Sequence, residues 1–179
     1  NINSATARVL DALKIELISA PNATCCGALR YHLNDQSGGL DNARQNIDAW
    51  WPQVEQGVEA IVMTASGCGV MVKDYGHLLA NDSQYAAKAK TISDLTKDIS
   101  EILPALEGEL ISLVGADPKP GVVYHPPCTL QHGQQIRGKV EGLLSSIGIG
   151  VRLCVDSHLC CGSAGTYSVT QPELSEQLR

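Results

Sequence analysis

The sequence predicts an α/β fold made of two pseudo-symmetric halves, with mostly parallel strands flanked by helices. Short apolar runs, typical of strands buried in a parallel sheet, alternate with amphipathic helical stretches along the 179 residues. Two kinds of unit also occur twice, and each ends in a cysteine-bearing loop. Open α/β sheets place such loops at the carboxyl ends of their strands. We therefore expect one cysteine-rich domain over residues 1–179, with halves at about 1–103 and 104–179.

The sequence of the first half predicts helices and short strands in alternation. An apolar stripe at helical spacing, with Ser4 as a candidate cap, predicts the first helix, and the polar turn at residues 34–39 precedes the second. The expected helices span residues 1–13, 40–56, about ten residues after Gly69, and 94–103. The expected strands span residues 15–18, 60–64 and 91–93.

The second half repeats this pattern after a linker predicted at residues 116–121, which is rich in proline and glycine. The run at 122–125 predicts a strand, and a helix is expected from Cys128 to Ile147. A further strand is expected at 149–155, before Cys160, Cys161 and Gly162. The last residues, 171–179, have the pattern of a helix.

The repeated units define where the cysteines lie. In one unit a strand, a tight loop and a single cysteine follow each other, as in IVMTASGCG around Cys68 and VVYHPPC around Cys128. In the other, a helix, a strand and a loop lead to CCG, as in ARVLDALKIELISAPNATCCG and VEGLLSSIGIGVRLCVDSHLCCG. Symmetry between the halves predicts one more strand-end cysteine before Asn1 and another beyond Arg179, so we expect a piece of a longer chain.

The composition disfavours several classes of protein, among them nucleic-acid-binding proteins, membrane-spanning proteins and disulfide-rich scaffolds. The chain has 13 Lys+Arg against 19 Asp+Glu and no basic cluster, which disfavours nucleic acid and anionic membranes as partners. No apolar run approaches the roughly 18 residues of a membrane span. Seven cysteines are an odd number and too few for a disulfide scaffold, and no secretory signal is visible. We expect a reducing compartment, with cysteines kept for chemistry or metal binding.

Three cysteines in each half are candidate ligands of a metal or cofactor. Thiolates bind zinc and iron–sulfur clusters, usually four to a site, and the glycine after each CC pair allows both sulfurs to face one site. The alternative is that these cysteines are structural or unoccupied. The candidates are Cys25, Cys26, Cys68, Cys128, Cys160 and Cys161.

Other residues near these cysteines have less specific roles. His125 and His158 lie within three positions of Cys128 and Cys160, so each is either a metal ligand or hydrogen-bond partner of the sulfurs, or an ordinary polar loop residue. Cys154, inside the apolar run VRLCV, is expected in the core. There is no GxxxxGK[ST] or GxGxxG motif, and a Cys128–His125 nucleophile pair would leave the repeated triplets unexplained.

Four segments carry a resemblance to a known family: CCGALRYHL, ASGCGVMVKDYGHLL, VVYHPPCTLQHGQQIRGKVEGLL and DSHLCCGSAGTYSVTQPELSEQLR. Together they resemble the cysteine-rich (CCG) region of the iron–sulfur subunit of bacterial glycolate oxidase, over nearly the whole chain. The resemblance implies an electron-transfer subunit of an oxidoreductase complex that converts glycolate to glyoxylate at a partner flavin subunit. This region alone would not be catalytic, and the longer polypeptide would carry two ferredoxin-type [4Fe–4S] motifs.

The same resemblance implies partners and cofactors. The partners are FAD-containing subunits and a quinone-level electron acceptor, in the cytoplasm or at the inner face of the plasma membrane. The six candidate cysteines match motif cysteines of the family, and Cys154 matches none.

The wider group includes lactate-utilisation proteins and the CCG-containing polypeptide of heterodisulfide reductase, which implies either a [4Fe–4S] cluster or zinc. Cys68 stands alone in SGCG, where the heterodisulfide-type motif usually has C-x-x-C. The alternatives are a structural zinc or metal-free interaction module, and a thiol–disulfide switch.

Overall fold

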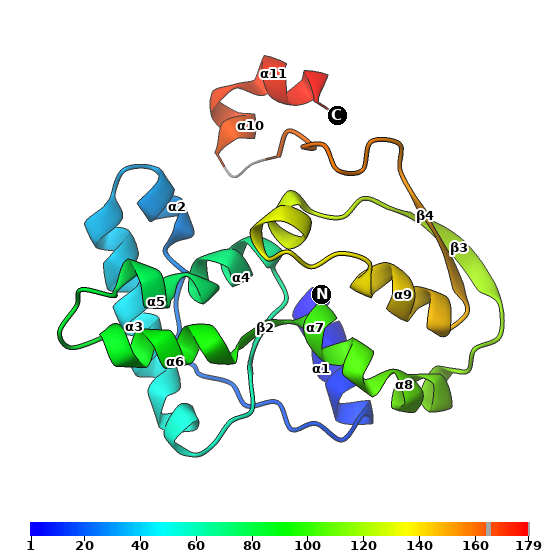
Figure 1. The fold of residues 1–179 in the computed structure, drawn as a ribbon, viewed down its shortest axis with the longest axis horizontal. Helices are drawn as coiled ribbons and strands as arrows, with labels where there is room; N and C mark the ends of the chain where they lie inside the picture. The colour runs from blue at the N-terminus through cyan, green and yellow to red at the C-terminus, as the bar shows by residue number, and fades with distance from the viewer. Residues whose placement is uncertain (164–165, 179) are drawn as a thin grey trace.

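The computed structural model describes residues 1–163 and 166–178, and its architecture confirms the predicted α/β class. The strands form two separate parallel pairs, and Figure 1 shows the longer pair along one side of the molecule with most helices on the other side. Among the described residues, no helix combines the length and the apolar character needed to cross a membrane.

The first half is mostly helical. Its parallel strands β1 and β2 are in register, with Ile61 opposite Thr96 and Met63 opposite Asp98. The elements in chain order are α1 (Ile2–Ala12), α2 (Ala28–His32), α3 (Gln36–Glu55), β1 (Ile61–Met63), α4 (Ser66–Lys73), α5 (Tyr75–Leu78), α6 (Ala86–Leu95), β2 (Thr96–Asp98) and α7 (Ile99–Ile102).

The second half contains the longer pair of parallel strands, β3 and β4, with Lys119 opposite Ile149 and Tyr124 opposite Leu153. Its elements are the 3-10 turn η1 (Leu103–Leu106), α8 (Glu107–Val114), β3 (Lys119–Tyr124), the π-helical turn η2 (Thr129–Gly133), α9 (Lys139–Ser146), β4 (Ile149–Leu153), α10 (Tyr167–Thr170) and α11 (Pro172–Gln177).

The hydrophobic core lies in the first half, where α3, α4, α5 and α6 pack together. Apolar side chains at helical spacing face inward from each helix and lose their contact with water, which is the main favourable term in folding. Cys26 belongs to this core, and Cys68 packs against it. The fully buried members include Ala43, Ile47, Val72, Tyr75, Ala89 and Ile92.

The two halves meet where α4 packs against η2. The hydroxyl groups of Ser66 and Thr129 are 2.7 Å apart, and the side-chain amide of Gln134 donates to the Ser66 carbonyl at 3.0 Å. A Cβ at Gly133 would lie 2.6 Å from a methyl group of Val70, so only glycine permits this approach. This contact brings together the chain segments that follow β1 and β3.

Two of the predicted strands are wrong. Residues 15–18 are extended but belong to no ladder, since no neighbouring strand lies beside them in the described part of the chain. Residues 91–93 are the end of α6, because Ile92 and Ala89 are three apart on the buried face of that helix. The strand that pairs with β1 comes next, at residues 96–98.

Several helix boundaries also differ from the prediction. The expected helix at 94–103 is reduced to α7, since residues 96–98 pair with β1. Asn1, rather than Ser4, caps α1 and accepts from the Ser4 N–H. The predicted turn at 34–39 already contains the start of α3, capped by Asp35.

The predicted linker and the helix expected after Cys128 are corrected too. The linker at 116–121 includes the start of β3. The helix expected from Cys128 to Ile147 is interrupted between η2 and α9, where Gly138 has a left-handed φ of 73°.

Candidate functional site

The first CC pair is held by a buried polar network that sequence reasoning missed. Asn46, fully buried on α3, accepts from the Thr24 N–H at 2.7 Å and donates to the Cys25 carbonyl at 3.0 Å. It also donates to the hydroxyl of Tyr75, which in turn donates to the Cys26 carbonyl at 2.8 Å. These bonds fix the backbone of both cysteines against α3 and α5. The sequence signal for this network is a polar residue, Asn46, on the same apolar face of the helix as Ala43 and Ile47.

Cys68 comes from α4 and joins Cys26 at the end of β1. The hydrogen bond with Cys68, together with burial, raises the pKa of Cys26, while the Cys26 hydrogen bond lowers the pKa of Cys68 to about 7. The backbone N–H of Ala28 acts in the opposite direction and lowers the pKa of Cys26, and Cys25 affects the pKa of both thiols. Cys26 and Cys68 thus form a donor–acceptor pair, with the exposed Cys25 beside it.

The glycine after each CC pair is required by its backbone and by its surroundings. Gly27 has a φ of 86° and Gly162 a φ of 75°, both in the left-handed region that favours glycine. A Cβ at Gly27 would collide with the Gly39 carbonyl, and one at Gly162 would collide with the Ser175 carbonyl. Both glycines make the tight turns that the repeated triplets predict.

The second set of cysteines gathers at the carboxyl ends of β3 and β4. Cys128 follows β3, and burial together with the neighbouring Cys160 raises its pKa. The backbone N–H of Cys161 acts against this shift and lowers the pKa of Cys128, and the Gly162 N–H donates to the Cys160 sulfur at 3.4 Å. Backbone donors of this kind favour the thiolate form.

Side chains around this second set anchor the two cysteine loops to each other. The amide of Gln131 is buried and donates to the carbonyls of Pro126 and Ser157, at 3.0 and 2.8 Å. The Ser175 hydroxyl donates to the Gly162 carbonyl at 2.7 Å. The sequence does not predict Gln131 and Ser175 as site residues, because their contacts with Ser157 and Gly162 bridge segments that are separate in the sequence.

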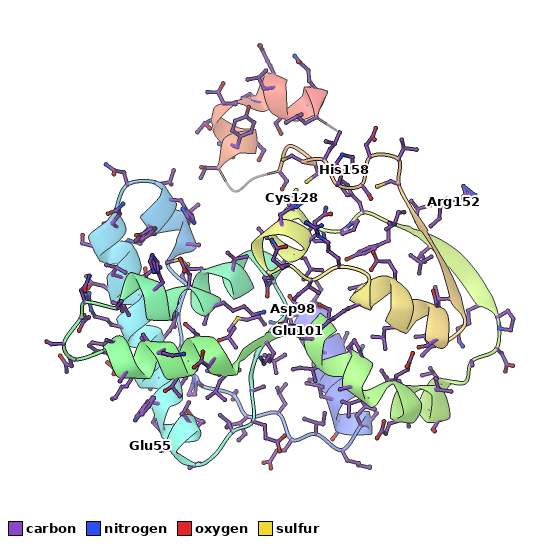
Figure 2. All side chains as sticks on the ribbon, in the orientation of Figure 1. Glu55, Asp98, Glu101, Cys128, Arg152 and His158 are labelled. Carbon is purple, nitrogen blue, oxygen red and sulfur yellow. The ribbon has the colours of Figure 1, made fainter. Side chains whose placement is uncertain are left out.

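The two predicted histidines lie in the same loops. The Nε2 atom of His125 is 3.3 Å from the Leu159 carbonyl, which also lies 3.8 Å from the Cys128 sulfur. Figure 2 shows Cys128 after β3 and His158 on the neighbouring loop after β4. The carbonyl of His158 is 3.0 Å from Nε2 of His132. Both histidines therefore border the second cysteine set through backbone contacts.

The three candidate cysteines of each half are neighbours, whereas Cys154 lies directly after β4. Cys154 is half-buried rather than in the core, and its N–H extends the pairing of β3 and β4 by donating to the Tyr124 carbonyl. Within residues 1–163 and 166–178, no three His, Cys, Asp or Glu side chains lie close enough together to bind a metal ion as they stand. Each set is a pair of interacting thiols with a third cysteine beside it.

The family model that matches this chain covers both cysteine sets. It describes a cysteine-rich domain, named CCG, and it matches residues 1–73 and 122–179. The chain belongs to the cysteine-rich CCG domain family. This CCG chain contains two copies of the defining triplet, each with a left-handed glycine at its end.

Curated relatives match the CCG chain over nearly its entire length. It is 53% identical, over all of its residues, to the glycolate oxidase iron-sulfur subunit of Escherichia coli K12, and spans 43% of that protein. It is 30% identical to the probable glycolate oxidase iron-sulfur subunit of Bacillus subtilis, over 98% of this chain and 39% of that protein. It is 28% identical to lactate utilization protein A of Bacillus subtilis, over 99% of this chain and 72% of the relative. The chain therefore spans less than half the length of the two glycolate oxidase relatives.

Proposed function

We propose that this chain is the cysteine-rich region of an iron–sulfur subunit that transfers electrons in a glycolate-oxidising complex. The observation that carries the proposal is the same in both halves: the cysteine that follows the first strand of a parallel pair, Cys68 or Cys128, is the neighbour of a CC pair that is distant in the sequence. The 53% identity to a protein named as a glycolate oxidase iron-sulfur subunit supports the reaction class. A metal-free packing role would not need the same triplet and strand-end cysteine twice.

In this proposal the ligands of the two sites are the sets Cys25–Cys26–Cys68 and Cys128–Cys160–Cys161. The donor chemistry fits an iron–sulfur cluster, because thiolates are its usual ligands and the Gly162 N–H already donates to the Cys160 sulfur in the second set. Such a cluster supplies one-electron transfer when bound. His125 and His158 act through hydrogen bonds around the second set, which tune the potential of such a centre. The fourth ligand of each site comes from outside the described residues.

The rest of the assembly follows from the resemblance. Glycolate is oxidised to glyoxylate at FAD in a partner subunit, and electrons pass through this subunit to a quinone-level acceptor. The complex lies in the cytoplasm or at the inner face of the plasma membrane. This region does not itself catalyse the oxidation. Its two halves, about 1–103 and 104–179, form one domain joined by the packing of α4 on η2.

The test is electron transfer in the anaerobically purified complex, with glycolate as donor and a dye as acceptor. Cys128→Ser removes a proposed ligand, and we expect at least about a tenfold loss of dye reduction, since even changes to residues that only contact the ligands of a metal cost about 10–100-fold. Flavin reduction by glycolate stays unchanged, because it occurs in the partner. Cys154→Ser, the matched control, keeps the full rate.

Two outcomes would contradict the proposal. Iron-depleted complex that still transfers electrons at the full rate would show that these cysteines hold no relay centre. Stoichiometric zinc without iron, together with unfolding by a chelator, would indicate a structural zinc module instead.

A further inference from the structure

An apolar groove separates the extended segment 15–20 from strand β1. Its volume is about 810 Å³, and its lining includes most of residues 15–20 and all of residues 60–63. Side chains of α1, α3, α7 and the turn after α7 also line it, among them Leu10, Trp50 and Ile102. Leu17 and Ile18 are about half exposed, at 49% and 50%, although their sequence pattern is that of a buried strand. The groove therefore lies where the sheet of the first half is expected to continue.

Both walls of the groove present backbone groups without a strand partner. In the described part of the chain, β1 pairs with β2 alone, so its second edge is open. Across the same described residues, the N–H groups of residues 16–20 make no backbone hydrogen bond. Unpaired edges of this kind accept a further strand. The groove is thus bordered by open edges as well as by apolar side chains.

The second half contains a strand that has no counterpart among the described residues of the first half. There β3 leads into η2 and α9, and β4 follows and pairs parallel to β3 before the triplet at Cys160. In the first half α1 corresponds to α9, and residues 15–20 correspond to β4, because both precede a CCG triplet. The counterpart of β3 would lead into α1 and pair with residues 15–20. The repeat therefore places an added strand against one wall of the groove.

The start of α1 lies at the correct end of the groove for such a strand. The Thr64 hydroxyl, directly after β1, donates to the Asn3 side chain in the first turn of α1, at 2.8 Å. Polypeptide leading into α1 therefore reaches it beside the carboxyl end of β1. A strand that fills the groove and then enters α1 must run parallel to β1, as strands in α/β sheets do.

We propose that the groove binds an additional β-strand, formed by polypeptide joined to the N-terminal end of α1. The strand lies between residues 15–20 and β1, so that the sheet order becomes residues 15–20, the added strand, β1 and β2. The glycolate oxidase relatives have more than half of their residues outside the matched region, which supplies chain for this strand. The inference concerns the fold and does not depend on electron transfer.

Amide hydrogen exchange of the longer polypeptide tests the proposal directly. We expect residues 16–20 to exchange as slowly as the paired residues of β3 and β4, because the added strand supplies their hydrogen-bond partners. In the 179-residue chain alone, residues 16–20 exchange quickly. Fast exchange of 16–20 in the longer polypeptide would overturn the proposal. Slow exchange in the 179-residue chain would overturn it too, because the groove would then close by itself.

Two proline variants of the longer polypeptide provide a second, matched test. Leu17 and Ile18 are equally exposed, and neighbouring residues of a strand direct their N–H groups to opposite edges. Proline removes that N–H. We expect one of Leu17→Pro and Ile18→Pro to lower Tm by several degrees and the other to be tolerated, as on a free edge. Equal effects of the two variants would contradict the added strand.

Discussion

Asn46 connects the core of the first half to its cysteine pair. Its side-chain amide accepts a hydrogen bond from the Thr24 N–H and donates to the Cys25 carbonyl and to the Tyr75 hydroxyl. The Tyr75 hydroxyl in turn donates to the Cys26 carbonyl. A buried polar group of this kind costs free energy unless all of its hydrogen bonds are made, and here the network also positions two thiols. Asn46 is therefore a positioning residue for the first site.

Replacing Asn46 tests this role. Asn46→Ala leaves the Thr24 N–H and the Cys25 carbonyl without partners, and we expect it to lower the free energy of unfolding by about 2–4 kcal/mol. Tyr75→Phe removes two hydrogen bonds, the one from the Asn46 amide and the one to the Cys26 carbonyl, and is expected to cost about 1–3 kcal/mol. Urea unfolding measures both. The adjacent, exposed Gln45→Ala is the control, with a change within about 0.5 kcal/mol. An equal cost for Asn46→Ala and Gln45→Ala would contradict the network.

At the scale of elements, α7 is fixed by a capping box and by an ion pair to α4. The Asp98 carboxylate accepts from the Ser100 N–H, while Glu101 accepts from the Asp98 N–H and from the Lys73 ammonium. Burial alone would raise the pKa of Glu101, but the Lys73 ammonium and the Asp98 N–H outweigh it and lower the pKa. The ionised carboxylate therefore stabilises the junction of α4, β2 and α7.

The ion pair between Glu101 and Lys73 predicts that the free energy of unfolding depends on pH. Because the pKa of Glu101 is lower in the folded chain, its contribution is complete above the unfolded pKa of about 4.3 and is lost as pH falls through the folded pKa. Glu101→Gln is expected to cost about 1–2 kcal/mol at pH 7 and progressively less below about pH 4. Unfolding curves at several pH values measure this. Asp94→Asn, which breaks the exposed pair with Lys90, serves as the control with little effect. A cost of Glu101→Gln that is independent of pH would contradict the account.

The elements that the sequence predicts well are those with a continuous apolar signal. Strands β1, β3 and β4 lie close to their predicted positions because their runs of Val, Ile and Met read as buried strands. Strand β2 has the sequence Thr-Lys-Asp and carries no such signal, since its pairing with β1 depends on tertiary contact. Residues 15–18 have the signal but lack a partner among the described residues. Local pattern therefore predicts which segments are able to form strands, and pairing decides which do.

The sequence points to the cysteines of the candidate site, but not to the side chains that hold the cysteine loops in place. The repeat singles out both triplets, and the three cysteines of each half are neighbours in the structure, but among the described residues no three of them are close enough to hold a metal as they stand, so their role as ligands stays a prediction. Asn46, Tyr75, Gln131 and Ser175 were not predicted, because each contacts a cysteine loop that is distant in sequence. Spacing along the chain carries no information about such contacts.

At the scale of the whole molecule, the packing of α4 on η2 relates the two cysteine sets to each other. Ser66 lies two residues before Cys68, Thr129 directly follows Cys128, and their hydroxyls are in contact. The Gly133–Val70 approach keeps this junction close. The carboxyl ends of β1 and β3 therefore meet in one region (Figure 1). The two proposed centres therefore lie on either side of one packed junction, an arrangement compatible with electron transfer between them.

If the six repeated cysteines hold iron–sulfur centres, as we propose, then the iron and acid-labile sulfide content of the polypeptide depends on them. The longer polypeptide is purified anaerobically as wild type, as Cys154→Ser, and with all six cysteines changed to serine. Differences between variants are compared, so that clusters elsewhere in the polypeptide cancel. We predict that the sixfold variant loses iron and sulfide together while Cys154→Ser retains both. Equal iron and sulfide in the sixfold variant and the wild type would contradict the account.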